Sequence, residues 1–346
     1  MLSKRTDLAL EAHELWRQAA QEESLPGLRT GESTCRGCTV TAVEITDDAA
    51  AHALGKPQGR YLTLDLAPLR MQAETALSDT AQALGEQLQT LLDKPVHRAL
   101  VVGLGNAAMT PDAIGPLTLR HVLITRHLQH KPPFSSLTSV SALAPGVSGS
   151  TGLEALEVLR GAVRAAQPEV VIAVDALASR ALSRVCSTVQ LSDTGIVPGS
   201  GVGNDRRALD RKTLGVPVIA VGVPTVVDAA TLAQDILEEA GAPAVDPGAL
   251  RGHNAGVMVT PRDIDAQVRT LSRLIGYGID LALHRWPRAH TCRRPAWPPS
   301  CRGPHPRRGW PDARSSATAG RAPSGVRSWR SWSRDSSSSH GQPHTR

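Results

Sequence analysis

Two aspartates follow apolar runs that are typical of buried β-strands. The run 170–174 ends on Asp175, and the run 98–102 leads through a glycine turn to Asp112. Because parallel strands deliver the residues at their carboxyl ends to one edge of a sheet, we expect both carboxylates to face one cleft. Two like charges at short range raise one pKa, so the pair shares a proton and can activate water while protonating a leaving amine. This is the chemistry of peptide-bond hydrolysis.

The same two acids admit other uses. Carboxylates with water as a co-ligand also hold divalent metal ions, which makes a metal-dependent peptidase the nearest alternative. An aspartate at the end of a strand can instead cap a helix or pair with an arginine such as Arg180. The residues alone do not assign which acid is the general base and which is the general acid.

Two glycine-rich segments follow strand-like runs close to these acids. Glycines 199, 201 and 203 resemble a phosphate cradle, but the Lys-Ser/Thr pair of a nucleotide-binding loop is absent. Tight turns beside a cleft, where a substrate backbone must approach closely, account for the glycines better. The predicted cleft residues are Gly103, Gly105, Asn106, Gly199, Ser200, Gly201, Gly203 and Asn204.

Two shorter motifs are set aside. Asp193-Thr194-Gly195 matches the pepsin-type aspartic proteases, but those enzymes need two copies in a β-rich fold and this chain has one. Cys35 and Cys38 have the spacing of a zinc or redox site, yet no second Cys/His pair stands at zinc-finger spacing, so free thiols are expected. We therefore predict neither a metal nor a cofactor.

The elements that must position the acids follow from hydrophobic periodicity. Alternation of strands and helices after residue 95 predicts an α/β fold, with a mainly parallel sheet and helices on both faces. Strands are expected over 39–45, 60–66, 98–102, 138–142, 170–174, 188–191 and 216–221. Helices are expected within 1–24, over 47–54, 71–92, 117–128, 153–166 and 176–185, in a segment ending at 239, and over 264–283.

The C-terminal segment 286–346 differs from the rest of the chain. It contains 12 Arg, 2 Asp and five of the six Trp, but no Leu, Ile, Met, Phe or Tyr. Since the whole chain carries +6 and this segment +10, residues 1–285 carry −4. A segment of this composition cannot bury enough apolar area to order itself, so disorder is predicted. A frameshift in GC-rich DNA explains the composition better than a basic, Trp-bearing nucleic-acid arm does.

The N-terminal residues give no sign of export. They are charged, and the chain has no run of about 18 apolar residues of the kind that spans a membrane. Five scattered cysteines suit free thiols in a reducing compartment. We therefore expect a cytoplasmic protein with no membrane partner and no nucleic-acid partner.

Long stretches of the chain resemble the germination proteases, the spore endopeptidases that degrade small acid-soluble spore proteins. The resemblance covers residues 4–284. The stretches that carry it are RTDLALEAHEL, VEIT, GRYLTLD, VVGLGN, TPDAIGP, LITRHL, APGVSGSTGLEAL, VIAVDALASR, SDTGIVPGSGVGNDRR, LGVPVIAVGVPTVVDA and GHNAGVMVTPRDID.

The resemblance implies an atypical aspartic endopeptidase whose essential acids are Asp112 and Asp175. It implies a phosphorylase/hydrolase-like α/β fold, similar to that of the hydrogenase-maturation endopeptidases, and a homotetramer made in the developing spore as a zymogen. Family substrates are cut after an acid and before a hydrophobic residue followed by Ala. Asp7-Leu8-Ala9 fits this pattern, so self-cleavage between Asp7 and Leu8 is predicted, with residues 1–7 as propeptide and 8–285 as one peptidase domain.

Two segments depart from the family pattern. The segment 240–252 is shorter than its counterpart in the family, and 286–346 matches nothing there. If the tail is genuine, a protein of another class, binding DNA or the spore coat through Arg and Trp, remains an alternative. Sequencing the gene across codons 280–346 separates the two origins of the tail.

Overall fold

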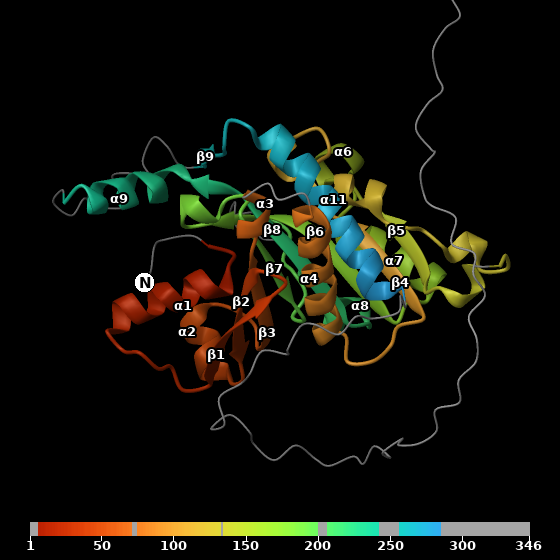
Figure 1. Ribbon diagram of the computed structural model, residues 1–346, viewed down its shortest axis with the longest axis horizontal. Helices are drawn as coiled ribbons and strands as arrows, with labels where there is room; N and C mark the ends of the chain where they lie inside the picture. The colour runs from red at the N-terminus through yellow and green to blue at the C-terminus, as the bar shows by residue number, and fades with distance from the viewer. Residues whose placement is uncertain (1–5, 71–74, 133, 200–205, 242–255, 285–346) are drawn as a thin grey trace, which may run out of the picture. The chain divides into compact units, whose positions relative to one another are not determined.

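The computed structural model describes residues 6–70, 75–132, 134–199, 206–241 and 256–284 (Figure 1). The predicted tail 286–346 and most of the segment 240–252 lie outside these residues. The described strands form one sheet in the order β1-β2-β3-β7-β8-β6-β4-β5, with β9 added beside β8. The strands are β1 (Leu28–Cys35), β2 (Cys38–Ile45), β3 (Gly59–Asp65), β4 (Arg98–Gly103), β5 (Ser139–Leu143), β6 (Val170–Ser179), β7 (Thr188–Ser192), β8 (Val218–Asp228) and β9 (Met258–Val259).

Parallel pairing is confined to one part of the sheet. Strands β5, β4, β6 and β8 pair in parallel, and β4, β6 and β8 are the apolar, β-branched runs that the sequence places in the core. Strands β7, β3, β2 and β1 continue the sheet in antiparallel pairing. The α/β class is confirmed.

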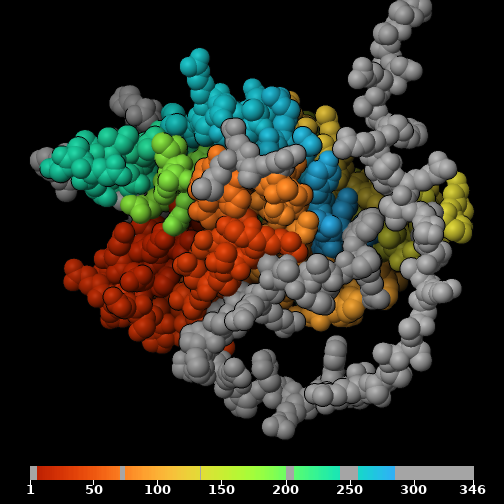
Figure 2. All heavy atoms as spheres, in the orientation of Figure 1, coloured from red at the N-terminus to blue at the C-terminus, as the bar shows by residue number. Residues whose placement is uncertain are grey.

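Helices cover both faces of the sheet. They are α1 (Ala9–Ala20), α2 (Asp48–Leu54), α3 (Ala67–Arg70), α4 (Ala76–Leu91), α5 (Ile114–Thr118), α6 (Ser148–Thr151), α7 (Ala155–Ala166), α8 (Arg211–Leu214), α9 (Ala229–Glu239) and α11 (Ile264–Leu283). Helices α4, α5 and α11 share a core with one face, and α7 and α8 share a core with the other. Helices α1 and α2 pack on the antiparallel end, and their residues, in red, gather in one region of Figure 2.

Helix α11 has the bounds expected from the sequence, and it lies against α4 (Figure 1). A Cβ on Gly85 of α4 would stand 3.0 Å from the Gly278 carbonyl oxygen of α11. Glycine at this crossing therefore lets the two backbones approach closely. The α11 residues that face α4 and the sheet are fully buried, among them Leu274 and Ile279.

The predicted helix over 176–185 is wrong. Strand β6 instead continues to Ser179, where it pairs with the long strand β8 through an irregularity between Leu177 and Ala178. Only a 3₁₀ turn, Leu182–Arg184, follows. The helical preference of Ala and Leu is weak, and pairing with the buried strand β8 outweighs it.

The predicted helix over 117–128 is also wrong. Helix α5 ends at Thr118, and 3₁₀ turns at Leu119–His121 and Arg126–Leu128 take its place. Thr125 explains the break, because its hydroxyl bonds both the Thr138 carbonyl (2.5 Å) and the Val140 amide (2.9 Å) beside β5. These bonds to the sheet compete with a continuous helix.

Two further differences are smaller. Strand β1 was not predicted, because its polar residues lack an apolar alternation; it is paired along its whole length with β2. Cys38 and Cys186 are free thiols, as expected, whereas Cys35 is disulfide-bonded, contrary to the prediction. Among the described helices none is long and apolar enough to cross a membrane.

Candidate active site

Asp175 lies near the middle of β6 with only 4% of its surface exposed. The Ala176 amide donates to its Oδ1 at 3.0 Å. In the sheet Asp175 pairs with Gly222 of β8, which pairs in turn with Gln190 of β7. Residues directly opposite one another project to the same face, so Asp175 and Gln190 lie in one row on one side of the sheet.

Asp112 ends the 3₁₀ turn between β4 and α5, and the predicted glycine turn holds it in place. The Asn106 amide donates to Asp112 Oδ2 at 2.7 Å. Gly105 has φ +103°, and a Cβ there would overlap the Asp112 carbonyl. Gly105 and Asn106, predicted as cleft residues, therefore shape the loop that presents Asp112.

Two further glycines bring this loop against β6. A Cβ on Gly103 would overlap the carbonyl of Gly115 in α5, and a Cβ on Gly115 would stand 2.6 Å from the Val174 carbonyl oxygen. The Leu104 amide also donates to the Val174 carbonyl at 2.8 Å. The missing side chains let α5 rest directly on β6 at the residue before Asp175, and Asp112 lies close enough for its charge to act on Asp175.

Both carboxyl groups hold a proton more firmly than an aspartate in water. Burial, followed by the charge of Asp112, raises the pKa of Asp175 well above its usual range; the Ala176 amide opposes this. Burial raises the pKa of Asp112, against the Asn106 amide and the charge of Arg206. The charge of Asp7 is a further cause of the raised pKa of Asp175, which places a third acid near the pair.

Asp7 is anchored to β6 three residues beyond Asp175. Its amide donates to the Ala178 carbonyl at 2.9 Å, and its Oδ2 accepts from the Ala178 amide at 2.8 Å. The next two residues, Leu8 and Ala9, are fully buried. The peptide bond predicted for self-cleavage is therefore enclosed beside the strand that carries Asp175.

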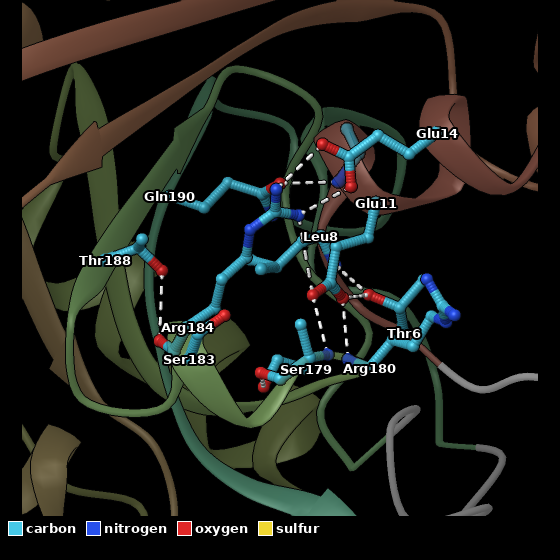
Figure 3. Close-up of polar contacts among 12 residues, drawn as sticks. Thr6, Leu8, Glu11, Glu14, Ser179, Arg180, Ser183, Arg184, Thr188 and Gln190 are labelled. Carbon is cyan, nitrogen blue, oxygen red and sulfur yellow. Dashed lines mark hydrogen bonds and ion pairs between the residues drawn. The ribbon is translucent and has the colours of Figure 1, made fainter. Parts of the chain in front are cut away.

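Glu11 secures the start of α1, as Figure 3 shows. It is 1% exposed, and its carboxylate accepts from the amides of Arg180 at 2.7 Å and Ala181 at 3.0 Å. The hydroxyl of Thr6 donates to the same carboxylate, and Arg184 lies 3.5 Å from it. Sequence reasoning missed Glu11, because a glutamate in the first turn of a helix is usually a solvent-exposed helix former.

The remaining predicted residues have other positions. Asp193 of the Asp-Thr-Gly motif is paired with Arg60, whose Nε lies 2.6 Å from its Oδ2 and whose amide donates to its Oδ1 at 2.8 Å. It therefore ties β3 to the end of β7. Gly199 adopts the left-handed conformation with φ +73°. The predicted cleft residues Ser200, Gly201, Gly203 and Asn204 lie outside the described residues.

A groove of about 910 Å³ opens farther along β7 and is lined in part by Thr63, Arg184 and Thr188. Thr63 pairs with Gln190, so this groove continues the row that contains Asp175. Among the described residues no group of three or more His, Cys, Asp or Glu side chains is arranged to hold a metal ion.

The α/β fold places the buried carboxyl group of Asp175 and the half-buried carboxyl group of Asp112 near one another and near the enclosed segment at Asp7, and such a pair of acids suits a peptidase. A family model described as germination protease matches residues 9–239. The chain belongs to the germination protease family, and the family assignment made from its sequence is confirmed.

Curated relatives extend the match beyond the family model. A germination protease of Caldanaerobacter subterraneus subsp. tengcongensis is 41% identical, over 82% of this chain and 95% of the relative. A germination protease from Clostridium perfringens is 38% identical, over 82% of this chain and 96% of the relative. One from Bacillus cereus is 44% identical, over 68% of this chain and 66% of the relative. The alignment with the Caldanaerobacter relative spans 313 positions, which is more than the 82% of this chain that it covers. The Caldanaerobacter relative therefore contains residues that have no counterpart in this chain.

A solved structure also resembles the chain. It is the [NiFe] hydrogenase maturation protease HycI from Thermococcus kodakarensis, with 18% identity and a TM-score of 0.32, over 56% of this chain and 98% of that one. This similarity is distant.

Proposed function

We propose that the chain is an endopeptidase in which Asp112 and Asp175 hydrolyse the peptide bond as a general acid and base. The observation that carries the proposal is the buried Asp175 beside the half-buried Asp112: burial raises the pKa of both carboxyl groups, and the charge of Asp112 raises that of Asp175 further. One carboxylate takes a proton from the attacking water, while the other carboxyl protonates the leaving nitrogen. Because burial is complete only at Asp175, Asp175 is the residue that holds the shared proton and Asp112 is the base.

The experiment that tests the pair replaces each acid by its amide. Asp112→Asn and Asp175→Asn keep the size of the side chain, so the fold should persist while cleavage of a small acid-soluble spore protein is lost. Asp93→Asn serves as a control, because the Asp93 side chain is 88% exposed and distant in sequence from both acids. Full activity in either amide variant would reject the pair.

The enzyme's substrates are small acid-soluble spore proteins, which it degrades as the spore germinates. The first bond that it cuts is in its own N-terminal segment, between Asp7 and Leu8. Cleavage falls after an acid and before a hydrophobic residue followed by Ala, which Asp7-Leu8-Ala9 satisfies. Leu8 and Ala9 are fully buried. The burial of Ala9 supports the preference for Ala at this position, because no space remains there for a larger side chain. Mass spectrometry of the incubated full chain should show a new N-terminus at Leu8.

The protein acts in the developing spore as a zymogen and assembles as a homotetramer. These features rest on family membership, and each has a direct test. Light scattering on the purified chain gives its oligomeric state, and fractionation of forespores gives its location. Deleting 286–346 should leave proteolysis unchanged if the tail plays no part in the reaction; DNA retention that disappears with the tail, at steeply salt-dependent affinity, would reveal a second function there.

Removal of metal ions by a chelator distinguishes the proposed acid pair from a metal-dependent peptidase that uses the same two acids. An acid pair that shares a proton needs no divalent ion, so exhaustive dialysis against a chelator should leave the cleavage rate unchanged. Loss of activity that returns with added divalent metal would favour the alternative.

A further inference from the structure

The carbonyl of Asp7 is the acceptor of two side-chain donors that come from separate parts of the fold. Lys56 Nζ donates to the Asp7 oxygen at 3.0 Å, and Gln190 Nε2 donates to it at 3.3 Å. Lys56 Nζ also reaches the Thr6 carbonyl at 3.1 Å. This oxygen belongs to the peptide bond between Asp7 and Leu8, and a carbonyl held by an ammonium and an amide is polarised before any attack on it.

Gln190 contacts the chain on both sides of that bond. Its Oε1 accepts from the Ala9 amide at 2.7 Å while its Nε2 donates to Asp7. One side-chain amide therefore spans Leu8 and fixes the backbone on either side of it. Gln190 is 8% exposed and stands in the row of the sheet that contains Asp175, with Gly222 between them.

The end of helix α2 determines the direction of the Lys56 side chain. The helix ends on Gly55 in the left-handed conformation (φ +63°), and the Lys56 amide returns to the Ala51 carbonyl at 3.1 Å. This turn directs the half-buried side chain toward the segment before α1. Burial lowers the pKa of Lys56, and the charges of Asp7 and Glu11 oppose that change and favour the ammonium form.

We propose that Lys56 and Gln190 hold and stabilise the carbonyl oxygen of Asp7 during cleavage of the Asp7–Leu8 bond. The proposal rests on the endopeptidase function proposed above. As water adds to the carbonyl carbon, the C=O electron pair moves to the oxygen that these two donors face. When the pair returns, the C–N bond breaks, Leu8 nitrogen takes the proton of the acid, and the base keeps the proton of the water. Donors set before the reaction stabilise this charge without reorganisation.

The Ala178 amide adds selectivity for the residue before the bond. It donates to the Asp7 carboxylate, while the Ala178 carbonyl fixes the Asp7 amide. An acidic side chain is thus recognised by one backbone N–H, and the carbonyl next to it is presented to Lys56 and Gln190. The same three groups would serve a substrate bound in place of this segment.

The test measures self-processing of the full chain by mass spectrometry, with a peptide containing Asp-Leu-Ala as a second substrate. Lys56→Met keeps the length of the side chain and removes its donors, and Gln190→Leu does the same for the amide. Removing one donor to a developing oxyanion typically lowers kcat by ~10²–10³-fold. We expect losses of that order in kcat with little change in KM, and partial recovery in Lys56→Arg. Lys94→Met, at an exposed residue, and Gln234→Leu, at a partly exposed residue of α9, are the matched controls and should process normally.

Each other outcome has a distinct meaning. Normal kcat in Lys56→Met and Gln190→Leu, together with inactivity of Asp175→Asn, would overturn the role of the two donors and leave the endopeptidase proposal intact. A change in KM alone, with no recovery in Lys56→Arg, would show that the contacts only anchor the segment. An active Asp175→Asn variant would instead count against the endopeptidase proposal itself.

Discussion

Asp7 and Ala178 form a closed pair of hydrogen bonds, 2.9 Å from the Asp7 amide to the Ala178 carbonyl and 2.8 Å from the Ala178 amide to the Asp7 carboxylate. The second bond uses the side chain, so it depends on the residue type at position 7. A charged acceptor makes a stronger bond to a backbone N–H than a neutral one. The relation links the acid preference of the proposed reaction to one backbone group of β6.

The first prediction concerns this pair. Asp7→Leu removes the acceptor and leaves the Ala178 amide without its partner, so self-processing should slow by roughly 10-fold or more, as expected for loss of a hydrogen bond to a charged group. Asp7→Asn keeps a neutral acceptor and should lie between Asp7→Leu and the unaltered chain. The rate of appearance of the Leu8 N-terminus measures the effect. Equal rates in all three chains would show that the Asp7 side chain does not contribute to recognition of the cleaved bond.

The second prediction concerns the pH dependence of the acid pair. Burial raises the pKa of both Asp112 and Asp175, and more strongly that of Asp175. Activity requires one proton on the pair, so it should fall at acid pH as Asp112 is protonated and at alkaline pH as Asp175 loses its proton. The acid limb should lie above the ordinary aspartate pKa. A kcat/KM profile on the Asp-Leu-Ala peptide that stays flat through both limbs would contradict it.

The third prediction is that Asp175, which catalysis requires, lowers the stability of the folded chain at alkaline pH. A raised folded-state pKa gives a contribution to stability that is fully present below the unfolded pKa and lost as pH rises through the folded pKa. Asp175→Asn carries no charge to lose, so its melting temperature should exceed that of the unaltered chain at alkaline pH and approach it at acid pH. Each unit of pKa difference corresponds to about 1.4 kcal/mol. Scanning calorimetry at both extremes measures this, and a lower melting temperature for Asp175→Asn at alkaline pH would be inconsistent with it.

The fourth prediction concerns Asp280, which lies outside the proposed site. Burial raises its pKa to about 7, although the Leu123 amide donates to its carboxylate at 2.9 Å. His284, 3.9 Å away, is the neighbouring titratable group. Since the folded-state pKa is raised, the contribution of Asp280 to stability should be lost as pH rises through about 7. Asp280→Asn keeps an acceptor for Leu123, so it should be the more stable chain at pH above about 8 and nearly equal at about pH 4.

Urea unfolding at those two pH values measures the difference. Asp93→Asn, at an exposed aspartate, should show no such pH dependence and serves as the comparison. An Asp280→Asn variant that is less stable at both pH values would indicate that the carboxylate is satisfied in its charged form.

The fifth prediction concerns the glycines beneath Asp112. A Cβ at Gly115 would stand 2.6 Å from the Val174 carbonyl oxygen, a backbone atom that cannot move aside. Gly115→Ala should therefore lower the free energy of unfolding by about 1–3 kcal/mol or more and shift Asp112, with a drop in cleavage rate. Gly161→Ala is the matched control, because a Cβ there meets nothing within 4 Å and helix α7 should gain up to about 1 kcal/mol. Equal stability of the two variants would contradict the packing argument.

The candidate acids could be found from the sequence because each comes after an apolar, β-branched run, although β6 continues past Asp175 to Ser179. The helix over 264–283 was likewise predictable, since its apolar period is continuous over 20 residues. The donors Lys56 and Gln190 could not be found in this way. One follows a short helix, the other lies inside a strand, and neither stands in a motif.

Local sequence by itself determined the apolar runs, the helical periods and the two acids that come after apolar runs. Tertiary structure decided whether Ala176–Ser179 would be helix or strand, because the choice depended on β8, more than 40 residues later in the chain. It also decided which polar groups face Asp7. Residues 56, 178 and 190 converge there through strand order and register, which are long-range properties of the sheet.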